Sequence, residues 1–269
     1  MKLGKLFAAL AGLALTLGFA GQAPAADAAP IKIGVYLPLT GQNAFGGQLE
    51  LEGVRLAHKE MPTVLGRPVE LVVVDNKSDK VEAANAVKRL VERDKVVALI
   101  GTYGSSLAMA GAEVAEKAKV PGVGTSCTNP LVTQGKKYYF RACFIDPYQG
   151  EKMANYAVEK LSAKTAAVFY QTGNDYSEGL MNAFVEKADE LGLEIVDTEA
   201  FAEGDKDFKA QMTNIAAADP DVVFAPIYYA EAGLAITAAR AAGCDAVFMG
   251  GDGFGSVKNY ASAEDLEGS

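Results

Sequence analysis

The chain has 269 residues, of which 50% are hydrophobic and 22% are charged, a composition that predicts one or two globular domains and excludes a disordered chain. Its 25 basic and 34 acidic residues give a formal net charge of −9. Because no block of Lys or Arg stands out, this charge argues against nucleic acid and against an anionic membrane surface as partners.

Residues 1–25 are predicted to be a secretory signal peptide outside the mature fold. Lys2 and Lys5 supply the positive start, residues 6–20 form an apolar run, and Ala23-Pro24-Ala25 has the small residues of a cleavage site. A membrane anchor is the alternative, but the apolar run is shorter than the roughly 20 residues that a spanning helix needs. We therefore expect a cleaved, periplasmic protein.

Short apolar strands alternate with amphipathic helices in the first half of the mature chain. Strands are predicted at residues 31–37, 68–75, 96–100, 120–123 and 138–143, with helices at 49–61, 79–91 and 108–118. Such near-continuous apolar strands predict a parallel sheet with helices on both faces. Two polar loops, residues 101–106 and 125–130, follow neighbouring strands at the edge where open α/β sheets hold ligands.

The pattern is interrupted at residues 146–150 and then restarts. Helices are predicted at residues 151–161, 177–191, 208–217 and 230–242, and strands at 165–171, 194–200, 221–226 and 246–250. We place a crossing between two lobes at the interruption. The predicted α/β chain is then divided into a signal peptide (1–25), lobe 1 (26–147) and lobe 2 (148–269).

Nine segments, in order along the mature chain, resemble the type I periplasmic binding proteins of ABC importers, in particular the branched-chain amino-acid-binding (leucine/isoleucine/valine-binding protein-like) branch. They read IKIGVYLPLTG, GGQLELEGVRLA, IGTYGSS, TNPLVTQG, FRACFIDPYQG, DYSEGL, GDKDFKAQM, PDVVFAPIYYAEAG and FMGGDGFGS. The resemblance implies a two-lobed type I periplasmic binding protein fold, each lobe a doubly wound, mostly parallel sheet with helices on both faces.

The resemblance also implies a function: capture of an amino acid, branched-chain or aliphatic, between the lobes and its delivery to the membrane permease subunits of an ABC importer. A same-fold receptor or sensor for amides, urea or small organic acids is the alternative. Family members continue past the FMGGDG segment and return to lobe 1. We therefore expect a C-terminally truncated chain whose lobe 1 lacks this return segment.

Three hydroxyl residues at the ends of lobe 1 strands are candidate ligand groups. Ser105 precedes a helix and could act as its N-cap, or could bind a ligand carboxylate together with the helix N-terminus. Ser126 and Thr128 could equally make local turn bonds. The resemblance implies that Ser105, the Thr128 hydroxyl and the Ser126 backbone contact the carboxylate and ammonium of an amino acid.

The resemblance places further ligand contacts in lobe 2. It implies that Tyr176 and Tyr228 contact the ligand, although Tyr229 could face inward in place of Tyr228. Asp252, in a GGDG segment, could be a turn residue, but the resemblance implies an anion opposite the ligand ammonium. Phe45 and Tyr103 are possible pocket walls.

The chain has three cysteines. Because an exported protein meets an oxidising compartment, a disulfide between Cys127 and Cys143 is possible, and two buried thiols are the alternative. With an odd number, Cys244 or another thiol stays unpaired. No CxxC pair or Cys/His cluster indicates a metal site.

The sequence argues against an enzyme. The only histidine, His58, falls within a predicted helix and is interpreted as a surface or boundary residue. The chain has no GxSxG, HExxH, Walker A or SxxK motif, and Gly250 to Gly255 does not match GxGxxG, so no cofactor is expected. A hydrolase is the rival from another class. We expect a monomeric binding protein.

Overall fold

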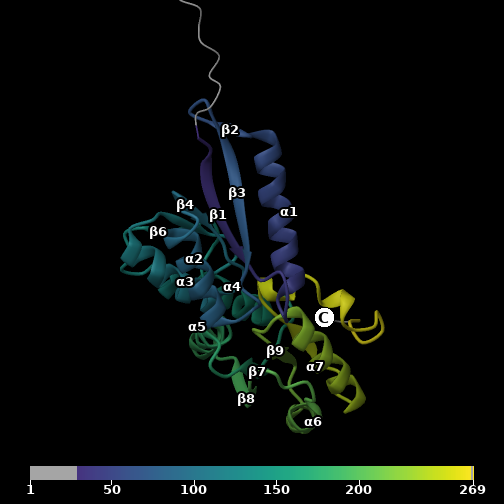
Figure 1. Cartoon of the computed structure of the whole chain (residues 1–269). Helices are drawn as coiled ribbons and strands as arrows, with labels where there is room; N and C mark the ends of the chain where they lie inside the picture. Colours follow the sequence, from purple (N-terminus) through teal and green to yellow (C-terminus); the bar gives the residue numbers. More distant parts are fainter. Residues whose placement is uncertain (1–28, 268) are drawn as a thin grey trace, which may run out of the picture.

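The computed structural model describes residues 29–267 and 269. The predicted signal peptide lies outside these residues. Across the part of the chain that the structure describes, no helix combines the length and the apolar character needed to cross a membrane. The predicted α/β class is confirmed, with two sheets flanked by helices (Figure 1).

The first sheet has six strands in the spatial order β2-β3-β1-β4-β5-β6. Their bounds are β1 (Ile31–Leu37), β2 (Thr63–Val64), β3 (Arg67–Asp75), β4 (Ala98–Ile100), β5 (Gly122–Gly124) and β6 (Tyr139–Arg141). All pairs are parallel except β2 with β3. The strand order changes direction between β1 and β4, and sheets of this kind bind ligands outside the carboxyl ends of the strands at such a point.

Three helices cover this sheet: α1 (Ala44–Glu60), α2 (Lys80–Glu92) and α3 (Ser105–Ala118). α2 and α3 pack on one face around Tyr36 and Leu99, whereas α1 packs on the other face against Val35 and Leu37 (Figure 1). On the α1 side, Val123 of β5 and Phe140 of β6 are 41% and 54% exposed. α1 therefore covers β1 and β3 and leaves β5 and β6 open.

The second sheet has four parallel strands in the order β10-β9-β7-β8. Its strands are β7 (Thr165–Gln171), β8 (Glu194–Phe201), β9 (Val222–Phe224) and β10 (Val247–Met249). Its helices are α4 (Asp146–Glu159), α5 (Asp175–Leu191), α6 (Lys209–Ala218) and α7 (Tyr229–Ala241). The Phe184 and Phe224 rings stack between α5 and one face of this sheet. The Phe169 and Phe208 rings pack edge to face on the opposite face of the sheet.

Several boundaries differ from the prediction, and three of these differences have a local cause. The segment 146–150, predicted to interrupt the pattern, forms the first turns of α4, because Pro147 is tolerated where a helix begins. α1 begins at Ala44, five residues early, since Gly46 and Gly47 let the helix approach Tyr103 and Pro38. β2 was missed because the turn before β3 places Leu65 at a φ of 52°. The predicted lobe boundary at 147/148 stays a prediction.

Gly150 offers a test of how α4 packs against α5. A Cβ added there would lie 2.6 Å from the Ala183 Cβ and 2.7 Å from the Phe184 backbone nitrogen. We expect Gly150→Ala to lower the free energy of unfolding by about 1 to 3 kcal/mol, because a backbone atom cannot move aside cheaply. Urea denaturation measures the change.

Gly53 in α1 is the matched control, because nothing lies within 4 Å of an added Cβ there. Gly53→Ala should raise the free energy of unfolding by about 0.5 to 1 kcal/mol through the better helix propensity of alanine. Equal stability of Gly150→Ala and the parent chain would contradict the close helix packing.

Candidate functional site

The loops at the carboxyl ends of β4 and β5 meet the helix N-termini of the second sheet. The Ser106 hydroxyl donates to Asp175 Oδ2 at 2.6 Å, and the Asn129 side-chain amide donates to the Asp175 carbonyl at 2.6 Å. Lys80 Nζ donates to the Gly173 carbonyl at 2.9 Å. These bonds join the two sheet-and-helix units across a cleft, so any ligand between them would contact both.

Ser105 is the first residue of α3 and not its N-cap. The N-cap is Gly104, which has no side chain to accept a hydrogen bond, so the predicted capping role of Ser105 is wrong. Its hydroxyl instead accepts the Asn129 backbone N–H at 3.1 Å. Ser105 therefore fixes the 125–130 loop, and the uncapped end of α3 keeps its partial positive charge.

The 125–130 loop is fixed by further hydrogen bonds. The Ser126 carbonyl accepts the Gly104 N–H at 3.0 Å, and the Thr125 hydroxyl donates to Glu50 Oε2 at 2.7 Å. Thr128 is buried, and its carbonyl accepts the Asp146 N–H at 3.0 Å. The backbone of this loop is therefore held in place before any ligand arrives.

An aromatic cluster spans the cleft. The Tyr228 ring stacks on Tyr176 with a centroid distance of 5.0 Å and lies 5.5 Å from the Tyr103 ring. The centroid of the Tyr229 ring lies 6.1 Å from that of Phe45 and 6.5 Å from that of Tyr103. The structure thus brings together all the predicted aromatic residues, including the alternative Tyr229, with two from the first unit and three from the second.

Asp252 is held by a side chain that the sequence interpretation missed. Gln149 Nε2 donates to Asp252 Oδ1 at 3.0 Å, and Gln149 Oε1 accepts the Asp252 N–H at 2.9 Å. Asp252 is open to solvent through the cleft, yet the surrounding protein raises the pKa of its carboxyl by desolvation. Gln149 lies in the segment predicted to be irregular, so only its place in the first turns of α4 shows its role.

Two further acids near the site were also missed. Burial raises the pKa of Glu50 and of Asp146 to about 7, against opposing hydrogen bonds from Ser126 and Thr125 to Glu50 and from Thr128 to Asp146. Among the described residues, Glu50 Oε1 and Asp146 Oδ2 are enclosed and have no hydrogen-bond partner. No sequence motif distinguishes these acids from exposed ones, since only the fold buries them.

Two cavities lie in this cleft. The smaller, about 220 Å³, is lined by Glu50, Tyr103, Ser126, Tyr229 and Asp252, among others. No Lys or Arg is among the described residues that line it. Its two acids and aromatic walls therefore suit a ligand that carries a cation and an apolar group.

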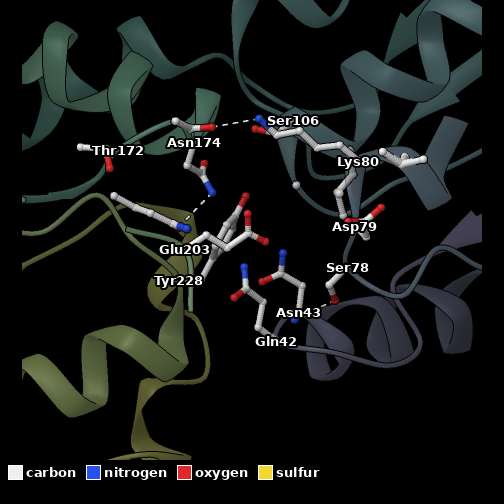
Figure 2. Close-up of a pocket in the computed structure, with 15 residues that line it drawn as sticks. Gln42, Asn43, Ser78, Asp79, Lys80, Ser106, Thr172, Asn174, Glu203 and Tyr228 are labelled. Carbon is white, nitrogen blue, oxygen red and sulfur yellow. Dashed lines mark hydrogen bonds between the residues drawn. The ribbon is translucent and has the colours of Figure 1, made fainter. Parts of the chain in front are cut away.

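The larger cavity, about 300 Å³, is polar and includes Tyr228 in its lining. Figure 2 shows the amides of Gln42 and Asn43 around the same space as Glu203 and the Tyr228 hydroxyl. Asn43 is 3% exposed, and its Oδ1 is enclosed without a hydrogen-bond partner in the described residues. Four of the predicted site residues line neither cavity, and these are Phe45, Ser105, Thr128 and Tyr176.

The remaining predicted residues lie outside both cavities. Cys127, Cys143 and Cys244 are all thiols in the structure, so the predicted bridge stays a prediction. His58 Nε2 lies 2.9 Å from the Val69 carbonyl oxygen, where it ties α1 to β3. Within residues 29–267 and 269, no group of three or more His, Cys, Asp or Glu side chains could hold a metal ion.

Residues 30–269 match the family model described as periplasmic binding protein. An amino acid binding protein of Pseudomonas aeruginosa is 33% identical over 229 residues, which are 84% of this chain and 61% of the relative. The leucine-, isoleucine-, valine-, threonine- and alanine-binding protein of the same species is 32% identical over 268 residues, 98% of this chain and 70% of the relative.

Two solved structures extend the similarity to the fold. The leucine binding protein LivK of Thermotoga maritima has a TM-score of 0.84 and 42% identity, covering 87% of this chain and 67% of that one. LivJ of Streptococcus pneumoniae, solved with isoleucine, has a TM-score of 0.83 and 36% identity, covering 88% and 68%. The chain thus spans between 61% and 70% of the length of these four proteins.

Proposed function

The chain belongs to the periplasmic binding protein family, and we propose that it captures an amino acid with a branched or other aliphatic side chain and delivers it to the permease subunits of an ABC importer. One observation carries the proposal: Asp252, held by Gln149, faces a cavity between two lobes that no basic residue among the described ones lines. The names of relatives that bind leucine, isoleucine and valine support the ligand class.

An α-amino acid would match both charged features of the cleft, the Asp252 carboxylate and the positively polarised N-terminus of α3. Its ammonium would pair with Asp252 and donate to the Ser126 carbonyl, which keeps a free lone pair beside its bond to Gly104. Its carboxylate would bind at the uncapped N-terminus of α3, where Ser105 begins the helix. A zwitterion brings a partner for each desolvated charge, which a singly charged ligand does not.

The aromatic cluster would hold the side chain of the ligand. Tyr103 and Tyr229 line the smaller cavity together with Leu49 and Gly46. We propose that Tyr176 and Tyr228 form a second layer that holds the Tyr103 ring in place, since Tyr228 stacks on Tyr176 and packs against Tyr103. Phe45 supports Tyr229 in the same way. An apolar ligand side chain would bind favourably against these rings, because its apolar surface is removed from water.

Closure of the lobes would convert binding into a signal for the permease. Each lobe supplies part of the contacts, so the ligand favours the closed state, in which all contacts form. Release must be possible, so the protein would carry out no reaction on its ligand. The proposed setting is the periplasm and the proposed working form is a monomer.

A thermal-shift panel of aliphatic, polar and aromatic amino acids, amides, urea and simple organic acids tests the proposal. A ligand at 100 times its Kd adds about 2.7 kcal/mol, which we expect to raise Tm by about 5 to 10 °C. Leucine, isoleucine or valine should give this shift, and the des-amino analogue of leucine should not.

The other outcomes of the panel separate the rival functions. Shifts with amides, urea or organic acids alone would overturn the amino-acid proposal in favour of a receptor or sensor of the same fold. Turnover of an ester or amide that Ser105→Ala abolishes would indicate a hydrolase.

A further inference from the structure

Two five-residue segments beside the proposed ligand site run side by side. Gly124 of β5 pairs with Arg141 of β6, and the Ala142 N–H donates to the Gly124 carbonyl at 3.0 Å. Four residues on, the Asp146 N–H donates to the Thr128 carbonyl at 3.0 Å. Residues 124–128 and 142–146 are therefore joined at both ends by backbone hydrogen bonds.

Cys127 and Cys143 both lie between these two bonds, one on each segment. The Cys127 sulfur lies beside Gly124, where a Cβ added to the glycine would come within 2.2 Å of it, and Cys143 is half-buried on the facing segment. The Arg141 guanidinium is anchored beside them, because its Nη1 donates to the Cys127 carbonyl at 3.1 Å. The two thiols are thus carried on neighbouring segments that are fixed at both ends.

The two thiols differ in access and in acidity. Cys127 is fully buried, whereas Cys143 is partly exposed. The neighbouring Cys127 thiol lowers the pKa of Cys143 to about 7, helped by the Cys127 N–H and the Arg141 charge, while the interaction with Cys143 and burial raise the pKa of Cys127. A partly exposed thiolate next to a buried thiol is the arrangement of an attacking and a resolving cysteine.

We propose that Cys127 and Cys143 are a redox pair that closes to a disulfide beside the ligand site. The Cys143 thiolate attacks one sulfur of a disulfide oxidant, such as oxidised glutathione, forming a mixed disulfide and releasing one thiolate of the oxidant. Cys127 then loses its proton and attacks the Cys143 sulfur, which expels the second thiolate. The two cysteines lose two electrons and two protons, and the oxidant becomes two thiols.

The bridge would act on the ligand site from both sides. Cys127 lies between Ser126 and Thr128, while Cys143 precedes Asp146 and Gln149, the residue that holds Asp252. Oxidation would therefore tie the loop of the first lobe to the start of α4. Cys244 takes no part, because it is buried among Phe248, Ala239 and other residues of the second sheet's core.

Counting thiols in the full chain tests the pairing. The protein is equilibrated with oxidised or reduced glutathione, denatured, labelled with a maleimide and weighed intact. The reduced chain should take three labels and the oxidised chain one, and Cys244→Ser should lower each count by one. Three labels on the oxidised chain, or a bridge that includes Cys244, would overturn the proposal.

Single variants and melting test the order of attack and the effect of the bridge. Cys127→Ser, which leaves Cys143, should form the glutathione adduct at least tenfold faster than Cys143→Ser, which leaves a buried thiol. Oxidation should raise Tm of the parent chain by about 5 to 10 °C and leave the double serine variant unchanged. An equal rise in the double variant would contradict the bridge, and equal adduct rates would contradict Cys143 as the attacking thiol.

Discussion

Asp252→Asn is expected to weaken the binding of leucine about 100-fold and to change the binding of the des-amino analogue less than about threefold. Removing one member of a close charge pair costs about 3 kcal/mol, since the ammonium is left desolvated without its counter-charge. The amide of Asn has the shape of the carboxylate, so the bond to Gln149 can persist. Calorimetric titration of both ligands at pH 7.5 measures the two changes.

The matched control is Asp245→Asn, which removes the same charge from an exposed position after α7. Its net charge equals that of Asp252→Asn, so any long-range electrostatic effect appears in both variants. The ligand affinity of the control should stay within about twofold of the parent, because exposed charges are screened by salt. Equal losses for leucine and for its des-amino analogue in Asp252→Asn would refute the pairing with the ammonium.

The strands and helices could be predicted because their signal is local. Apolar runs such as residues 31–37 and the apolar spacing of 177–191 determine their own structure, and β1, β7 and α5 appear within two residues of the prediction. The prediction for residues 146–150 was wrong because Pro147 and Gly150 are residues typical of a loop. Gly150 is explained only by its contact with Ala183 and Phe184 of α5, which lie more than 30 residues later in the chain.

In the candidate site, too, some residues could be predicted from the sequence and others are explained only by tertiary contacts. The hydroxyl and aromatic residues could be proposed because a family resemblance pointed to their positions, and the structure brings the aromatic ones together. Gln149, Glu50 and Asp146 could not be proposed, because nothing local separates a buried acid or amide from an exposed one. The roles of Glu50 and Gln149 arise from contacts between residues more than 70 positions apart, Thr125 with Glu50 and Gln149 with Asp252.

The buried acids make the free energy of unfolding depend on pH in a direction opposite to that of paired carboxylates. The folded pKa of Glu50 and of Asp146 is about 7, above the ordinary values of 4.5 and 3.8. Between about pH 4 and 7 the folded chain therefore keeps protons that the unfolded chain has lost, and stability falls as pH rises through this window. The carboxyls with lowered pKa values, such as Asp75 and Asp221, stay ionised above pH 5 and add little to this slope.

Glu50→Gln should stabilise the ligand-free protein by about 3 kcal/mol at pH 8 and by less than about 1 kcal/mol at pH 5. One pKa unit is worth about 1.4 kcal/mol, and the glutamine replaces the charged form that burial penalises at pH 8 while its carbonyl oxygen can still accept from the Thr125 hydroxyl. Urea denaturation at both pH values gives the two free energies. Glu52→Gln, at an exposed position on the same helix, is the control and should change neither. A Glu50→Gln chain no more stable than the parent at pH 8 would show that Glu50 is ionised at little cost, and the cleft would then hold a second full negative charge facing the ligand.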